Sequence, residues 1–164
     1  MVSPDNILMY LLPEQETQVK EIFAQLAESG FPQQNQTPHI TVTFAPTMRP
    51  AAIQRAAEIL PPLMPAEFRR VGTVIFGTKS KQTVAWLLET SDELEEAARE
   101  ISRLNPDGRG DRWIPHLTMG LRIPRDIVPD YVHALDEITN PHFRTLNAPR
   151  AAFWSPKVQE LTEF

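Results

Sequence analysis

The chain has 164 residues, of which 41% are hydrophobic, so it is long and apolar enough to bury one core and is not typical of a disordered protein. Its formal net charge is −5 and it contains no cysteine. These two facts exclude disulfides, thiolate catalysis, cysteine-bearing zinc sites and a long-range attraction of the whole molecule to nucleic acid or acidic membranes. The apolar run at residues 7–12 is too short for a membrane span, so we expect a cytoplasmic protein.

Apolar periodicity predicts alternating strands and helices in the first half of the chain. The side chains of Val19, Ile22, Phe23 and Leu26 repeat at helical spacing before Gly30, which is a usual helix stop. Short β-branched runs bounded by proline predict the strands. The expected order is a strand at 6–12, a helix at 14–29, a strand at 39–45, a helix at 50–60 and a strand at about 68–76.

The same order repeats in the second half. Ser91 can cap a helix whose apolar stripe runs from Leu94 to Leu104. We expect a strand at 83–89, this helix, a polar loop at 105–112, a strand at 113–123, a helix that begins near 126–129, and strands near 143–154 and 157–164. The sequence therefore predicts one α+β domain over residues 1–164, made of two pseudo-symmetric βαβ-type lobes at roughly 1–80 and 81–164.

Each copy has the same signature on its second predicted strand. The two signatures are Pro38-His39-Ile40-Thr41 and Pro115-His116-Leu117-Thr118, and their offset is 116 − 39 = 77 residues. Two units related by a pseudo-twofold axis would bring the equivalent strands together and face both histidines into one cleft. Residues i and i+2 of a strand share a face, so each histidine would be joined there by its threonine.

Two imidazoles in one cleft can perform acid-base chemistry. The unperturbed pKa of histidine is about 6.5, so near neutral pH one ring can be neutral while the other is protonated. Hydrolysis with one acid and one base requires this combination. The hydroxyls of Thr41 and Thr118 can donate hydrogen bonds to phosphate oxygens. A single such motif is most often an ordinary strand-edge histidine, but two copies at matching positions favour a functional site.

On these two motifs the chain resembles the 2H phosphoesterase superfamily, and more closely its 2'-5' RNA ligase branch. The motifs are His39-Ile40-Thr41-Val42 and His116-Leu117-Thr118-Met119. The resemblance implies two lobes that form a concave antiparallel sheet with the helices outside. It also implies action on 2',3'-cyclic phosphates of RNA ends, on 2'-5' linkages or on small cyclic nucleotides. Some relatives have an arginine after the second motif, and the nearest here is Arg122, whose even spacing predicts the His116 face.

Other side chains are weaker candidates. Trp113 and Phe44 could stack a base, although core packing is the commoner role of such aromatics. A rim of arginines around the second motif could bind phosphate or could be a solvated surface; its members are Arg109, Arg112, Arg122 and Arg125. His133 and His142 have no second ligand at metal spacing, so we expect neither a metal nor another cofactor.

The favoured interpretation is a monomeric, metal-independent phosphodiesterase with His39 and His116 as its acid-base pair. Its expected substrate is an RNA or oligonucleotide end with a 2',3'-cyclic phosphate, and a reversible 2'-5' RNA ligase activity stays open. The alternatives keep the same residues but act on a small cyclic nucleotide, an ADP-ribose cyclic phosphate or a 2'-5'-linked oligonucleotide. A module that binds a nucleotide without chemistry is the competing class.

Overall fold

A computed structural model describes residues 3–164 of the chain. Within these residues the strands form two four-stranded antiparallel sheets. The first sheet has the order β2 (His39–Ala45), β1 (Asp5–Tyr10), β7 (Arg150–Ser155) and β8 (Glu160–Glu163). The second has the order β5 (His116–Pro124), β4 (Lys81–Glu89), β3 (Ala66–Phe76) and β6 (Thr145–Ala148).

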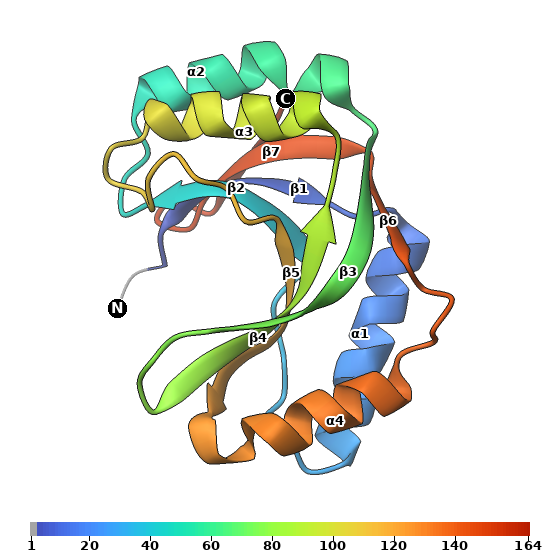
Figure 1. Cartoon of the computed structure of the whole chain (residues 1–164). Helices are drawn as coiled ribbons and strands as arrows, with labels where there is room; N and C mark the ends of the chain where they lie inside the picture. The colour runs from blue at the N-terminus through green and yellow to red at the C-terminus, as the bar shows by residue number, and fades with distance from the viewer. Residues whose placement is uncertain (1–2) are drawn as a thin grey trace.

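Pairs of helices cover the outer faces of the two sheets. The helices are α1 (Pro13–Glu28), α2 (Pro50–Ile59), α3 (Asp92–Arg103) and α4 (Val128–Ile138), with short 3-10 turns at Pro61–Leu63 and Arg125–Ile127. Helices α2 and α3 pack together, with α3 against β2, while α1 and α4 pack together, with α4 against β4. Figure 1 shows the strands curling around an open concave side with the helices outside, as the resemblance implied. The α+β class and the two pseudo-symmetric units are therefore confirmed.

The predicted order of strand, helix, strand, helix, strand occurs twice, but the third strand of each copy joins the sheet of the other copy. Strand β3 from the first copy pairs with β4, and β7 from the second copy pairs with β1. Each sheet therefore contains strands from both halves of the chain. A cut near residue 80 would not separate the two sheets.

Prolines explain two differences from the predicted strands. The strand predicted at 143–154 is two strands, β6 and β7, which belong to different sheets and are separated by Pro149. Proline has no N–H to donate to a ladder, so the chain can leave one sheet there and enter the other. The strand predicted at 113–123 begins only at His116, because Pro115 likewise has no donor.

The exposed edges of the two sheets meet at β2 and β5, which carry the two motifs. The strands lie in contact but belong to different sheets, and side chains make the hydrogen bonds between them. The Gln34 side chain, before the first motif, accepts a hydrogen bond from the Leu121 N–H at 2.7 Å and donates to the Leu121 carbonyl at 3.5 Å. In the opposite direction, Trp113 Nε1, before the second motif, donates to the Thr41 carbonyl at 2.9 Å.

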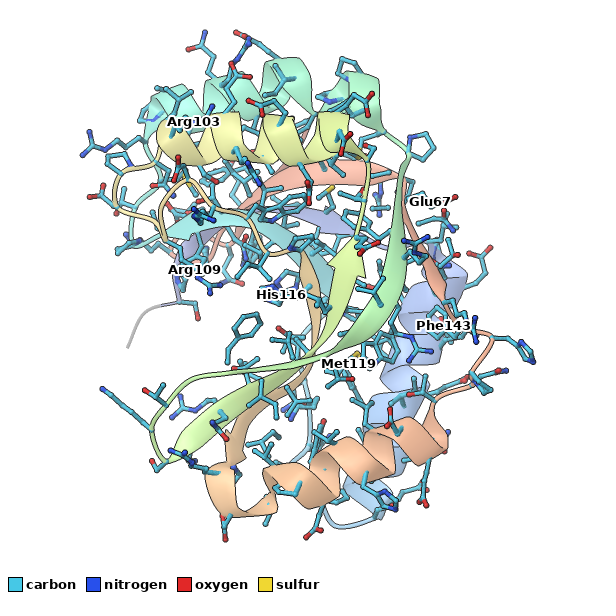
Figure 2. All side chains as sticks on the ribbon, viewed as in Figure 1. Glu67, Arg103, Arg109, His116, Met119 and Phe143 are labelled. Carbon is cyan, nitrogen blue, oxygen red and sulfur yellow. The ribbon has the colours of Figure 1, made fainter. Side chains whose placement is uncertain are left out.

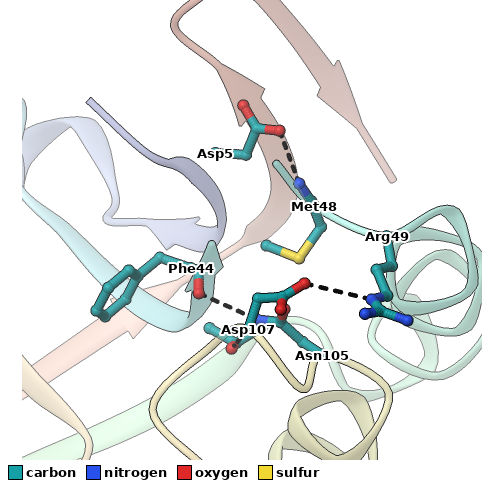
Figure 3. Close-up of polar contacts among 7 residues, drawn as sticks. Asp5, Phe44, Met48, Arg49, Asn105 and Asp107 are labelled. Carbon is teal, nitrogen blue, oxygen red and sulfur yellow. Dashed lines mark hydrogen bonds and ion pairs between the residues drawn. The ribbon is translucent and has the colours of Figure 1, made fainter. Parts of the chain in front are cut away.

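A third side-chain contact joins the loop after α3 to β2. The buried Asn105 amide donates to Thr43 Oγ1 at 2.8 Å and to the Phe44 carbonyl at 3.0 Å (Figure 3). Arg49 and Asp107 add an exposed ion pair beside it at 3.3 Å. The loop over residues 105–112 is therefore attached to the motif strand of the other copy. This attachment determines where Arg109 lies.

Strand β5 packs on α4 at a position that tolerates only glycine. A Cβ added to Gly120 would lie 2.6 Å from Cε1 of the buried Tyr131, whose hydroxyl donates to the Met119 carbonyl. Phe31 packs against the Tyr131 ring in a T-shaped contact, with the ring centroids 5.3 Å apart, and so opposes its movement. The backbone of the second motif strand can therefore approach the helix only through Gly120.

Substitution of Gly120 by alanine is expected to destabilise the protein by about 1–3 kcal/mol through overpacking. Gly72 is the matched control, because an added Cβ there has no neighbour within 4 Å and its φ is not in the left-handed region. Denaturant unfolding of both variants checks the prediction. A Gly120→Ala variant as stable as Gly72→Ala would mean that the ring of Tyr131 moves freely.

Candidate functional site

The two motif histidines occupy equivalent places in the two halves. His39 is the first residue of β2 and His116 is the first residue of β5, and both are half-buried. Each Nδ1 lies 2.7 Å from a backbone carbonyl two residues earlier, that of Thr37 for His39 and that of Ile114 for His116. The same local geometry has thus formed twice.

These carbonyl contacts determine how each ring is protonated. A carbonyl oxygen only accepts, so Nδ1 must carry a hydrogen in both rings. In the neutral ring Nε2 is then a free base, and in the protonated ring it is an acid. Neither Nε2 has a hydrogen-bond partner among the described residues. Both histidines can therefore exchange a proton with a bound molecule through Nε2.

Burial lowers the pKa of both histidines below the usual 6.5. For His39 the burial effect exceeds the effect of the Thr37 carbonyl, which raises the pKa. For His116 burial is again the largest cause; the Ile114 carbonyl raises the pKa, whereas the positive charges of Arg109 and His39 lower it. A charge on His39 therefore disfavours a charge on His116.

The threonines lie two residues after the histidines and share their face of the strand. Thr41 and Thr118 are half-buried, whereas the residues before them, Ile40 and Leu117, are fully buried in the core. This is the alternation that the sequence predicts for a strand with one polar and one core face. Each imidazole therefore shares the non-core face of its strand with a threonine hydroxyl, and the two motif strands lie in contact.

Each motif strand contains a β-bulge directly after its threonine. The pairing passes from Leu8↔Thr41 to Ile7↔Thr43 in one sheet, and from Ala85↔Thr118 to Val84↔Gly120 in the other. Val42 and Met119 are the extra residues. A bulge exchanges the two faces of the following residues, so Phe44 and Leu121, each five residues after its histidine, become exposed at 43% and 46%.

Arg122 lies in a further bulge of β5. The pairing shifts again between Val84↔Gly120 and Gln82↔Ile123, and Arg122 has the left-handed φ of 56°. Two bulges separate it from His116, so its even spacing does not determine its face, contrary to the argument from alternation. Its guanidinium is exposed at the surface. A contact between Arg122 and substrate stays a prediction.

A small pocket of about 90 Å³ opens beside His116 and Thr41. Phe44, Trp113 and Arg109 contribute to its wall. The Trp113 ring is half-buried and meets the core residue Phe68 edge to face, with the ring centroids 6.3 Å apart. Trp113 therefore packs against the core, which is the commoner role of such aromatics, and it also lines the pocket. Base stacking by Trp113 or Phe44 stays a prediction.

Sequence reasoning missed Phe76, which lies at the end of β3. Its ring packs on the imidazole of His116 with the centroids 4.7 Å apart, and the Arg109 guanidinium lies 5.1 Å from the ring centroid on a cation–π contact. Figure 2 shows Arg109 and His116 near each other at the concave side. No pattern in the sequence marks Phe76, because β3 reaches this site only through its exchange into the second sheet.

The remaining histidines lie outside this site. His133 is exposed on α4 and pairs with Glu137 at 3.1 Å, and His142 lies in an exposed turn. Among residues 3–164 no three His, Cys, Asp or Glu side chains come together as metal ligands would. No helix of the described chain is long and apolar enough to cross a membrane.

Comparisons with known proteins point to one family and one fold. Residues 11–86 match the family described as "LigT like Phosphoesterase", a segment that contains the first motif and ends before the second. Comparison with curated proteins gives no match. The structure is similar to Kluyveromyces marxianus Usb1 with uridine monophosphate, with a TM-score of 0.56 and 10% identity over 98% of each chain.

A second structure of Kluyveromyces marxianus Usb1 gives a TM-score of 0.53 at 10% identity, over 98% of this chain and 96% of that one. At such low identity the likeness concerns the fold alone. It extends over both halves of the chain, including the half that the family match leaves out. The match over residues 11–86 confirms the resemblance to LigT-like phosphoesterases of the 2H superfamily that the two motifs predicted, and the chain shares its fold with the Usb1 structures.

Proposed function

We propose that this protein hydrolyses a 2',3'-cyclic phosphodiester at the end of an RNA or oligonucleotide, with His39 and His116 as a metal-independent acid-base pair. One observation carries the proposal. Two histidines, each with Nδ1 held by a backbone carbonyl, leave Nε2 of both rings without a partner among residues 3–164, and a charge on His39 disfavours a charge on His116. A site of this kind favours one neutral and one protonated histidine during turnover.

In the proposed reaction one Nε2 accepts a proton from water while the water oxygen attacks phosphorus. The bond from phosphorus to one ribose oxygen breaks, and the other Nε2–H protonates that oxygen. A phosphate monoester and a free ribose hydroxyl result. The two histidines exchange protonation states in the reaction, and proton exchange with solvent restores them. Attack by a ribose hydroxyl of a second strand in place of water would give the ligase direction.

The hydroxyls of Thr41 and Thr118 would hold the non-bridging phosphate oxygens in line for attack. Phe76, Phe44 and Trp113 offer apolar surface to the nucleoside, and Arg109 and Arg122 offer guanidinium groups to the phosphates that follow it. Uridine monophosphate in one of the two Usb1 structures supports a nucleotide ligand for this fold.

The experiment that tests this function is turnover on a panel of cyclic phosphates in the presence of a chelator. The panel contains an oligonucleotide with a 2',3'-cyclic end, 2',3'-cyclic mononucleotides, ADP-ribose cyclic phosphate and 2'-5'-linked oligonucleotides. We expect monoester product, with the oligonucleotide end as the best substrate. Preference for another member would change the assigned substrate, and binding without product would indicate a nucleotide-binding module.

Replacement of either motif histidine should abolish most of this activity. His39→Ala and His116→Ala are each expected to lower kcat by about 100-fold or more, because each removes one partner in proton transfer. The double variant should lose less than the product of the two effects. His133→Ala is the matched control, since that histidine is exposed on α4, outside the site, and pairs with Glu137. Near-normal turnover by either single variant would exclude that residue as acid or base.

The threonine hydroxyls are tested by valine, which keeps the β-branched shape. Thr118→Val should lower kcat/KM by about 10- to 150-fold, because a hydrogen bond to a charged phosphate is worth roughly 1.5–3 kcal/mol. The half-buried position should leave the melting temperature nearly unchanged. If Thr118→Val kept the wild-type kcat/KM, the hydroxyl would have no role in activity, and Thr118 would serve only through its β-branched shape on the strand.

The lowered histidine pKa values predict an acidic pH optimum for kcat/KM. Catalysis needs one protonated ring, and with both pKa values below 6.5 most molecules carry none at pH 7. The rate constant should therefore rise as the pH falls from 7, and decline again when both rings are protonated. An optimum above pH 7 would contradict the pKa directions.

Arg109→Gln supplies the matched test of the cause. Removal of this positive charge raises the pKa of His116, so the fall of kcat/KM on the alkaline side of the pH profile (its alkaline limb) should move to higher pH. Arg112→Gln changes the same loop but not a charge that acts on His116, and it should leave the limb in place. Equal movement in both variants would point to a general electrostatic effect of the loop.

A further inference from the structure

The two halves of the site match residue for residue, which makes any difference between them informative. The strand partners of the motif residues lie at the same offset as the motifs, 116 − 39 = 77 residues. The four pairs are Tyr10↔His39 and Leu87↔His116, then Leu8↔Thr41 and Ala85↔Thr118. Two residues further out on the same face, the first half has Asn6 and the second half has Thr83.

Asn6 makes a contact that its counterpart does not. Its Nδ2 donates a hydrogen bond to Thr41 Oγ1 at 3.1 Å. Thr83 makes no hydrogen bond to Thr118, and the Thr118 hydroxyl has no partner among the described residues. The Thr41 carbonyl is also held, by Trp113. Thr41 is therefore fixed through both its side chain and its backbone, whereas the hydroxyl of Thr118 is free to rotate.

The orientation of the Asn6 amide follows from its surroundings. Its Oδ1 is buried and has no partner within the described chain. The reverse orientation would place the two N–H donors of Nδ2 in that buried position without an acceptor. A buried unpaired N–H is rarer than an under-satisfied carbonyl. The amide therefore donates to Thr41 and does not accept from it.

A threonine hydroxyl has one hydrogen to donate and lone pairs that accept. With an N–H of Asn6 on one lone pair, Thr41 keeps its own hydrogen for another partner. We propose that Asn6 is a positioning residue that fixes the Thr41 hydroxyl as a hydrogen-bond donor to the phosphate, so that the Thr41 half of the site is the preorganised anchor. This inference rests on the proposed function for the identity of the phosphate ligand.

The test is a double-mutant cycle between Asn6 and Thr41. Asn6→Leu removes the amide, and it is expected to lower kcat/KM by about 3- to 10-fold in the wild-type background through loss of one hydrogen bond. In the Thr41→Val background the same change should have no further effect, because the hydroxyl that Asn6 orients is absent. Thr83→Val is the matched control at the equivalent position of the other half. It should leave kcat/KM unchanged in both the wild-type and the Thr41→Val background.

Asn6→Asp is the second variant. It keeps the shape of the side chain, so it serves as the test if the Asn6→Leu variant does not fold. A carboxylate only accepts, so Thr41 must turn its hydrogen toward Asp and away from phosphate. Its loss of activity should exceed that of Asn6→Leu. Melting temperatures measured alongside separate an effect on positioning from an effect on folding.

The affinity for inorganic phosphate, measured by calorimetry, gives a second readout that needs no turnover. If the effects of Asn6 and Thr41 on phosphate affinity were coupled but no substrate were turned over, the proposed hydrolysis would be wrong and the positioning role would stand. Equal effects of Asn6→Leu in both backgrounds, or no effect in either, would overturn the positioning role while hydrolysis stood. Absence of both turnover and phosphate binding would overturn both.

Discussion

Hydrogen bonds from side chains across the junction of β2 and β5 are the interaction on which the site depends. Both strands are edges of their sheets, and no ladder joins them. The Gln34 side chain hydrogen-bonds to the backbone N–H and carbonyl of Leu121, and the Asn105 side chain to the carbonyl of Phe44. These bonds satisfy backbone groups that a neighbouring strand would otherwise satisfy. Both amides are buried, where a hydrogen bond is stronger and a missing partner is costly. The two edges are therefore held in one relative position, which is the position that brings the histidines together.

The same junction bears on how an acidic protein could offer a site to an anion, as the proposed function requires. The net charge of the whole chain is −5, whereas the pocket beside His116 is lined by the guanidinium groups of Arg109 and Arg112. Asn105 attaches the loop of Arg109 to β2, and Phe76 supports its guanidinium from the other side. Local placement thus opposes the overall charge, and the positive charge of Arg109 lowers the pKa of His116.

Duplication of a unit gives two equal half-sites, but the substrate of such a site is not symmetric. A cyclic phosphate offers one bond to break and one direction of attack, so one half must differ from the other. In this chain the largest differences lie beside the motifs rather than in them. Asn6 in the first half corresponds to Thr83 in the second, and Tyr10 corresponds to Leu87. The positive charge of Arg109 acts on His116 but not on His39. Under the proposed function the motifs would supply the chemistry, and their neighbours would determine the orientation of the substrate.

Some features of the site could be predicted from the sequence because they depend on short-range periodicity. The alternation of His39-Ile40-Thr41 with a core face, the repetition of the motif after 77 residues (116 − 39) and the cap at Ser91 are all local properties of the chain. The bounds of the helices follow from the spacing of apolar residues and from Gly30 and the prolines. Fold class and the two motif pairs were therefore accessible without a structure.

Other features depend on contacts between residues far apart in sequence, and only the tertiary structure decided them. The exchange of β3 and β7 between sheets carries Phe76 to His116, although nothing near Phe76 in the sequence resembles a site. The bulges after Thr41 and Thr118 are shifts in the register between neighbouring strands, so alternation along one strand could not give the face of Arg122. A sequence records which side chains are present and their local period, but the burial, the register and the long-range partners that set their roles exist only once the chain has folded.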